Sequence, residues 1–230
     1  MCNRHISRIT DKKRRTLMEI TMARIPLIHI PLGIYSVVSK CNNDEFHFDA
    51  AEKFDFYLRH LLQCKRKLGF LLYDVCCMSN HVHELYRVPE DVTIASILQR
   101  VKGDFSRLYN QHYGRSGHFW RNKPFYRIVQ NEQYALHSCH YYHENPVRAG
   151  IVKHPWEWPY SGYRFHMLGD RSGLLGALLN AIPGYTCEQW QHTSSQRLIG
   201  FDQQLQRVRN RFIGEETYRR QMKLRFRPFG

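Results

Sequence analysis

Two short apolar segments separated by a polar turn constrain the fold of this chain more than any other feature. Residues 70–77 form a mostly apolar run that begins after Gly69, which is typical of a short buried β-strand. Met78-Ser79-Asn80 has the composition of a turn, and residues 81–88 form a second strand-like segment. The two segments therefore predict a β-hairpin.

Other strands and helices are predicted on both sides of this hairpin. Asn131 can cap a helix at its start, and Pro146 is expected to end that helix. The order strand, helix, strand, strand, helix, strand, helix predicts an α+β domain of the ferredoxin-like, split βαβ type, with helices packed on a mostly antiparallel sheet. The periodicity predicts strands over 32–39 and 118–129 and helices over 49–67, 92–113 and 131–145.

The two ends of the chain differ from this central region. Residues 1–24 are basic and predict a weakly structured arm, and residues 25–169 are predicted to form the folded domain. Residues 170–230 predict a basic C-terminal helical appendage, with a loop around a short apolar run at 170–184. Within it, apolar residues three and four positions apart predict an amphipathic helix. These residues are Leu198, Phe201, Leu205, Val208 and Phe212.

The chain has a formal net charge of +14 and a pI of about 9.6. Self-repulsion on this scale favours a polyanionic partner, and nucleic acid is the first candidate. Residues 100–127 interleave cations with aromatic rings, a composition that suits phosphates and stacked bases of single-stranded nucleic acid. A solvated basic surface over a core of rings is the other interpretation. The predicted DNA contacts here are Arg100, Lys102, Arg107, Arg115, Trp120, Arg121, Lys123 and Arg127.

The sequence contains no apolar run of membrane-spanning length, so neither a span nor a membrane partner is predicted. The basic N-terminal segment lacks the apolar stretch and the cleavage site of a secretory signal. Seven cysteines at irregular spacing suit reduced thiols better than a disulfide framework. These features predict a cytoplasmic protein.

His81 and His83 are the first candidates for chemistry. Residues two apart on a strand point to the same face, so both imidazoles can bind one divalent cation from one side. A third ligand must come from elsewhere in the fold. The alternative is a pair of surface or hydrogen-bonded histidines without a metal.

Tyr141 and Asn145 form a second candidate pair, because residues four apart share one face of a helix. A tyrosine hydroxyl can attack phosphorus and hold the product covalently, and an amide oxygen one turn away can complete a metal site. Nitrogen and oxygen ligands suit Mg²⁺ or Mn²⁺, whereas Zn²⁺ more often recruits cysteine. The alternative is a core tyrosine and a helix-ending asparagine. Tyr142 is less suitable, since Pro146, four residues later, has no ligand atom.

The segment Cys77-Met78-Ser79-Asn80-His81-Val82-His83 resembles the HUH signature (His, hydrophobic, His) of single-tyrosine transposases. Three further motifs resemble the REP-associated branch of this family, where REP denotes a repetitive extragenic palindrome. The resemblance covers residues 22–169. The motifs are Gly117-His118-Phe119-Trp120, Tyr141 followed by Asn145-Pro146-Val147-Arg148-Ala149-Gly150, and Trp158-Pro159-Tyr160-Ser161.

The resemblance implies a DNA transposase, a single-stranded DNA endonuclease and strand transferase that forms a 5′-phosphotyrosine. It implies Tyr141 as the nucleophile and His81, His83 and Asn145 as ligands of Mg²⁺ or Mn²⁺. The expected partners are single-stranded DNA and DNA hairpins, and the chain is expected to act as a monomer or homodimer. His137 and Arg148 join the predicted DNA contacts.

Two positions depart from the family pattern, and several other functions remain as alternatives. Glu84 stands where an apolar residue is usual, and Ser36 where a histidine often follows the tyrosine of the first strand. The alternatives are an HUH nickase of replication or conjugation, a DNA-hairpin binding protein without catalysis, and a zinc-stabilised structural protein.

Overall fold

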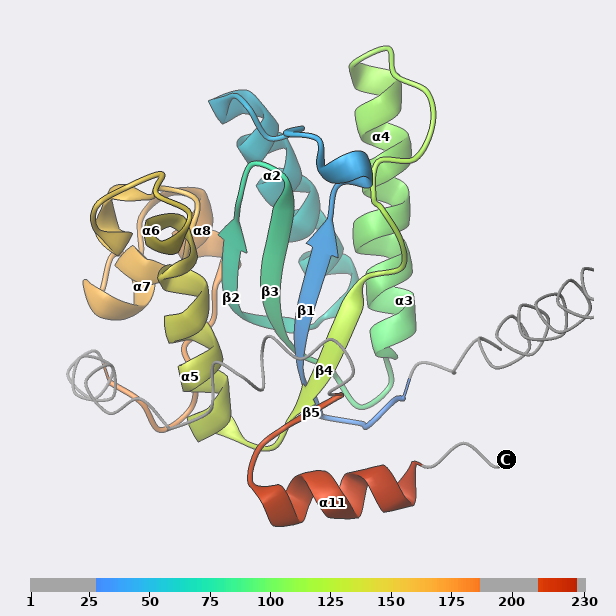
Figure 1. The fold of residues 1–230 in the computed structure, drawn as a ribbon, viewed down its shortest axis with the longest axis vertical. Helices are drawn as coiled ribbons and strands as arrows, with labels where there is room; N and C mark the ends of the chain where they lie inside the picture. Colours follow the sequence, from blue (N-terminus) through green and yellow to red (C-terminus); the bar gives the residue numbers. More distant parts are fainter. Residues whose placement is uncertain (1–27, 187–210, 227–230) are drawn as a thin grey trace, which may run out of the picture. The chain divides into compact units, whose positions relative to one another are not determined.

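A five-stranded sheet organises the computed structural model, which describes residues 28–186 and 211–226 (Figure 1). The described residues between His29 and Arg225 belong to one compact unit. The strand order in the sheet is β2-β3-β1-β4-β5. The strands are β1 (Ile34–Lys40), β2 (Leu71–Cys77), β3 (His81–Arg87), β4 (Phe125–Val129) and β5 (Phe212–Ile213).

The strand pairing confirms the predicted α+β architecture. β3 lies between β1 and β2 and is antiparallel to both, and β4 pairs antiparallel with the free edge of β1. Strands β1 and β2 thus run in the same direction with one strand inserted between them, which is the split βαβ arrangement. The predicted hairpin is the β2–β3 pair, in which the Met78 amide donates to the His81 carbonyl oxygen.

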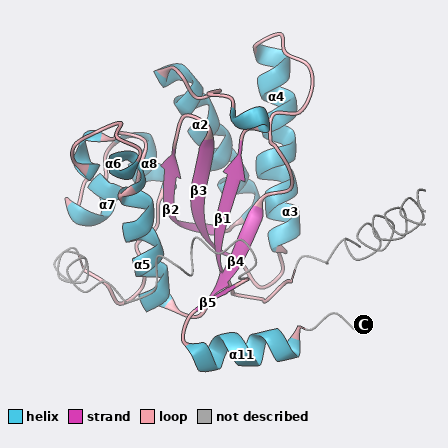
Figure 2. Ribbon diagram, in the orientation of Figure 1, coloured by secondary structure: helices cyan, strands magenta, loops and turns pink. Residues whose placement is uncertain are grey.

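Helices cover both sides of the sheet (Figure 2). Helix α2 (Ala51–Leu68) ends at Gly69, whose φ of 68° is the left-handed conformation that favours glycine at a helix end. It packs beside a second helical segment composed of α3 (Ile94–Leu98), a π-helical turn (Gln99–Asp104) and α4 (Phe105–His112). Helix α5 (Glu132–His143) contacts β1, β2, β3 and β4.

Successive side chains of β3 point to opposite faces of the sheet, one covered by α2 and the other by α5. Glu84 and Tyr86 contact α2 and the residues just after it, through Tyr57 and Phe70. His83 instead contacts Tyr142 of α5. Odd-numbered and even-numbered residues of β3 therefore contact different helices.

Three local predictions are wrong. Within residues 118–129 only β4 is a strand, although Trp120 makes an isolated bridge to Cys41. Residues 170–184 include a helix, α8 (Gly173–Leu178), because the apolar run packs against α2 and buries Leu178. The helix predicted over 131–145 ends before Pro146 as expected, but it ends at His143, so Asn145 does not lie on the same helix as Tyr141. Asn145 and Pro146 instead begin a separate helix, α6 (Asn145–Arg148), where the missing N–H of Pro146 costs little. A 3-10 helix (Pro155–Glu157) and α7 (Tyr163–Met167) lie between α6 and α8.

The C-terminal part of the described chain returns to the sheet. β5 pairs in parallel with β4 and buries Phe212 and Ile213, and α11 (Glu216–Arg225) follows it. Phe212 is therefore in a strand rather than at the end of the amphipathic helix predicted from its spacing. The rest of that predicted helix lies outside the described residues.

No helix within 28–186 and 211–226 has the length and apolar character needed to cross a membrane.

Candidate active site

The two strand histidines and the two tyrosines of α5 line one pocket of about 690 Å³. The imidazole ring centres of His81 and His83 lie 4.9 Å apart, on the face of the sheet that α5 covers. We call this cavity the His–Tyr pocket. It is lined by Ser36, Val38, Lys40, His81, His83, Arg121, Asn122, Lys123, Phe125, Arg127, Tyr141, Tyr142 and Asn145.

Asn145 reaches the histidine pair from the start of α6. Its amide nitrogen lies 3.0 Å from Nε2 of His83. A half turn of the terminal amide exchanges its nitrogen and oxygen, so either atom can face the imidazole. Two imidazoles and a side-chain amide thus line the same pocket, and nitrogen and oxygen donors of this kind are the set expected for Mg²⁺ or Mn²⁺. The roles of these three residues as ligands stay a prediction.

Both histidines are neutral near pH 7, as metal ligands must be. Burial, and then the positive charge of Lys40, lower the pKa of His81 to about 4. Burial also lowers the pKa of His83 well below its usual value, with a smaller effect of the neighbouring His81. Nδ1 of His81 lies 2.7 Å from Oδ1 of Asn80 and can only donate there, which leaves the Nε2 lone pair for a ligand.

The two adjacent tyrosines of α5 have different environments. Tyr142 is fully buried, and its hydroxyl lies 2.6 Å from that of Ser36. Burial raises the pKa of Tyr142 well above its usual value. Tyr141 is only partly buried, its ring centre lies 6.0 Å from that of His83, and the Arg148 guanidinium lies 4.6 Å from the ring centre. Tyr141 is therefore the better placed of the two to meet a substrate.

Four cations give the His–Tyr pocket its positive charge. Arg121 and Lys123 are exposed, whereas Arg127 is almost fully buried and lies over the ring of Phe125. Burial lowers the pKa of Arg127 to about 10, so its guanidinium still carries a proton at pH 7. Lys40 pairs with His81 in the sheet register and was missed by the sequence analysis, because it ends β1 one residue beyond the predicted strand.

The remaining predicted DNA contacts separate into buried and exposed groups. Lys102 is 3% exposed and forms an ion pair of 2.5 Å with Glu84, so its prediction as a DNA contact is wrong. Trp120 and His137 are also buried, and the Trp120 indole N–H donates to the Lys102 carbonyl oxygen. Outside the His–Tyr pocket, Arg107 and Arg148 are exposed and Arg100 and Arg115 partly so.

The two departures from the family pattern now have structural explanations. Glu84 is fully buried on the opposite face of β3, where Lys102 and the Tyr57 hydroxyl contact its carboxylate. It therefore lies away from the His–Tyr pocket. Ser36 holds the hydroxyl of Tyr142, a contact that spacing alone does not predict.

The fold and the pocket together define a small α+β domain in which imidazole, amide and phenol groups converge within a basic cavity. Residues 33–145 match the family of IS200-like transposases. The chain therefore belongs to this family.

Two curated relatives and one solved structure are similar to the chain. A Haemophilus influenzae protein assigned as a REP-associated tyrosine transposase is 26% identical over 100 residues, covering 39% of this chain and 56% of that protein. The REP-associated tyrosine transposase of Escherichia coli is 26% identical over 108 residues, covering 46% of this chain and 62% of that protein. The chain thus spans less than two thirds of either relative.

The fold also has a solved counterpart. A REP-associated tyrosine transposase bound to a REP hairpin superposes with a TM-score of 0.57 at 17% identity, covering 72% of this chain and 96% of that one. At this identity the likeness concerns the fold alone.

Proposed function

We propose that this protein is a REP-associated type of DNA transposase, which cuts single-stranded DNA and rejoins it with Tyr141 as the nucleophile. One observation carries the proposal: Tyr141, His81, His83 and Asn145 line a single pocket that also contains four Lys or Arg side chains. A phenol, a set of metal-ligand atoms and positive charge are what phosphoryl transfer to tyrosine requires.

His81, His83 and Asn145 would hold the divalent cation, Mg²⁺ or Mn²⁺. When bound, the cation would polarise the scissile phosphate and offset the charge that develops on its oxygens. The neutral state of both imidazoles supports this assignment, because their lone pairs are available without loss of a proton.

Tyr141 would attack the phosphorus of a DNA phosphodiester through its hydroxyl oxygen. The new bond joins that oxygen to phosphorus, and the bond between phosphorus and the 3′-oxygen breaks. The tyrosine loses its proton, and the leaving 3′-oxygen gains one. Because the 5′-phosphotyrosine keeps the phosphodiester linkage, a second DNA 3′-hydroxyl can attack it and rejoin the strands. Arg127 and Lys40 would neutralise phosphate charge within the pocket.

The proposed substrate is a DNA hairpin with an adjacent single strand. The solved relative that shares this fold was bound to a REP hairpin, and this chain has exposed cations beside its pocket. Arg121 and Lys123 would contact phosphates and position the strand without reading its sequence. The basic helix α11 offers a second phosphate-contacting surface through Arg219, Arg220 and Lys223.

Incubation with labelled hairpin oligonucleotides and Mg²⁺ or Mn²⁺ tests this function. We expect cleavage with a covalent protein–DNA adduct, followed by joining when a second 3′-hydroxyl strand is supplied. Tyr141→Phe should bind the hairpin nearly as well as the unaltered protein and form no adduct. Hairpin binding without an adduct from either protein would instead identify a DNA-binding protein without catalysis. Cleavage that does not depend on a hairpin would favour a nickase.

A further inference from the structure

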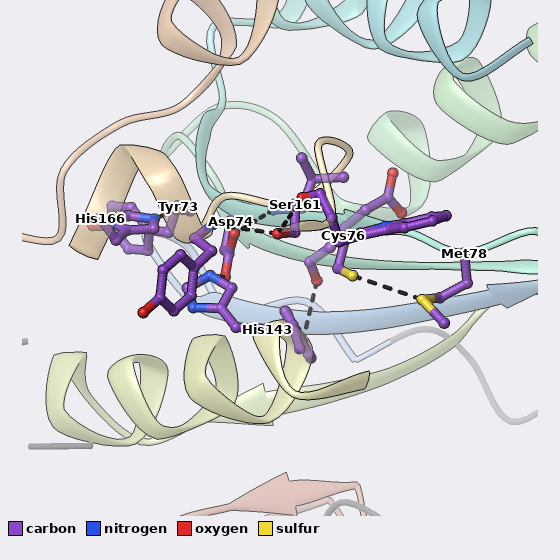
Figure 3. A network of polar contacts seen from close by, with 12 residues as sticks. Tyr73, Asp74, Cys76, Met78, His143, Ser161 and His166 are labelled. Carbon is purple, nitrogen blue, oxygen red and sulfur yellow. Dashed lines mark hydrogen bonds and ion pairs between the residues drawn. The ribbon is translucent and has the colours of Figure 1, made fainter. Parts of the chain in front are cut away.

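A second group of metal-ligand side chains lies away from the His–Tyr pocket, in the core beneath α5. Asp74 of β2, Cys139 of α5 and His166 of α7 each present a ligand atom, and these three atoms lie within 4.8 Å of one another. Their exposed fractions are 0%, 0% and 4%. Figure 3 shows Asp74 and His143 pointing toward one another, and His143 Nε2 lies 2.9 Å from Asp74 Oδ2. We call these four residues the Asp–Cys–His cluster.

Hydrogen bonds hold the ligand atoms of this cluster in orientation. His166 Nε2 lies 2.7 Å from the carbonyl oxygen of Tyr73 and therefore donates to it, which leaves Nδ1 with the lone pair. A metal-binding histidine commonly donates its other ring N–H to a backbone carbonyl in this way. The backbone amide of Val75 donates to Oδ1 of Asp74, 2.8 Å away. Residues that contact the ligands thus fix two of them before any metal is bound.

The close approach of Gly162 keeps the carboxylate in this position. A Cβ atom at residue 162 would lie 2.1 Å from Oδ1 of Asp74, so any other residue would displace the carboxylate. Gly162 is itself held by its amide, which donates to the carbonyl oxygen of Val75. The surroundings are apolar and include Tyr73, Cys76 and Met167.

Charge balance favours a divalent cation in such an environment. A carboxylate buried among apolar side chains is costly unless an opposite charge lies beside it. A dication with one carboxylate, one thiolate and two neutral imidazoles is neutral as a whole. Burial and the nearby Asp74 raise the pKa of the Cys139 thiol, and a coordinating cation would reverse this effect by deprotonating it.

We propose that Asp74, Cys139, His166 and His143 bind a structural zinc ion, distinct from the catalytic cation of the His–Tyr pocket. One thiolate, two imidazoles and one carboxylate are ligands that zinc accepts in closed tetrahedral sites, whereas Mg²⁺ and Mn²⁺ avoid sulfur. The ion would tie β2, α5 and α7 together. Since α5 also carries Tyr141, zinc would fix the helix on which the proposed nucleophile lies.

Zinc content measured by mass spectrometry tests this proposal without any assay of activity. The full chain with both His81→Ala and His83→Ala is purified with zinc present, so that the His–Tyr pocket cannot hold the metal. We expect one equivalent of zinc per chain, and loss of that equivalent on further substitution Cys139→Ser. Cys76→Ser is the matched control, because Cys76 is equally buried in the same apolar cluster and does not belong to the ligand group formed within residues 28–186 and 211–226.

A second readout covers the case in which Cys139→Ser does not fold. Cobalt(II) bound in place of zinc should give a thiolate-to-cobalt absorption band in the His81→Ala, His83→Ala protein, and the band should persist with Cys76→Ser. A zinc-free chain that binds no cobalt through sulfur would overturn the proposal. The cluster would then be explained by the Asp74–His143 contact alone. Zinc that remains after a folded Cys139→Ser substitution would overturn it as well.

Discussion

The two faces of strand β3 carry polar residues at adjacent positions with opposite surroundings. His83 lines a pocket whose lining includes the exposed side chains of Arg121 and Lys123, whereas Glu84 is fully buried between the sheet and α2. On the first face two neutral imidazoles lie beside an amide and the four cations of the His–Tyr pocket, and no carboxylate of the described residues lines that pocket. On the second, a carboxylate, a phenol and an ammonium group satisfy one another. The comparison predicts that substitutions on the first face remove activity, and that those on the second remove stability.

The largest expected effect is loss of cleavage when the metal-ligand atoms of the first face are removed. His81→Ala and His83→Ala should each abolish the covalent DNA adduct, as should chelation of the divalent cation, because the scissile phosphate would lose its polarising charge. Hairpin binding and the unfolding midpoint in urea should change little. An active His83→Ala protein would show that this face does not hold the cation.

The second face should respond in the opposite way. Lys102→Met leaves the Glu84 carboxylate buried without its cation and should lower the free energy of unfolding by about 3–5 kcal/mol. Adding Glu84→Leu to this variant should recover much of that loss, since two apolar side chains replace the pair. Arg107→Met is the control, because its side chain is 72% exposed and its removal should change stability by at most about 1 kcal/mol. Urea denaturation measures all three.

A smaller loss of stability is expected from substitution of Tyr142, the buried tyrosine of the His–Tyr pocket. Tyr142→Phe removes the hydroxyl that contacts Ser36 and should cost about 1–3 kcal/mol, because the buried Ser36 hydroxyl loses that partner. The folded variant should still form the covalent adduct. Loss of the adduct at a protein concentration and temperature where the variant is folded would assign chemistry to Tyr142 instead.

The smallest effect concerns the rim of the pocket. Arg121→Ala removes an exposed cation that contacts Asp44, and should weaken hairpin binding modestly while leaving stability unchanged. The slope of log binding constant against log salt concentration should fall by about 1 if Arg121 contacts one phosphate. An unchanged slope, measured by titration at several salt concentrations, would place the DNA path elsewhere.

The same comparison explains which features the sequence could predict. The hairpin and the face shared by His81 and His83 follow from local periodicity and a turn, which need no knowledge of distant residues. Burial of Lys102 could not be predicted in this way, because its partner Glu84 comes from another element and helical spacing alone treats a lysine as exposed. Strand β5 was missed for a related reason: two residues carry no periodicity, and their pairing with β4 is long-range.

The Asp–Cys–His cluster could be predicted least of all from the sequence, because its residues are far apart along the chain. Its residues come from β2, α5 and α7, so no spacing within one segment relates Asp74, Cys139 and His166. The N-terminal arm at 1–24 and the boundary at residue 169 remain predictions, as do the monomeric or dimeric state and the compartment.

Peptide mapping of the trapped protein–DNA adduct tests the central claim most directly. The unaltered protein is incubated with a hairpin oligonucleotide and Mn²⁺, digested with a protease, and the DNA-linked peptide is sequenced by mass spectrometry. We predict that the DNA is attached to Tyr141, which lines the pocket beside His83 and is only partly buried. Attachment to Tyr142, to Tyr134 or to a serine would contradict the account.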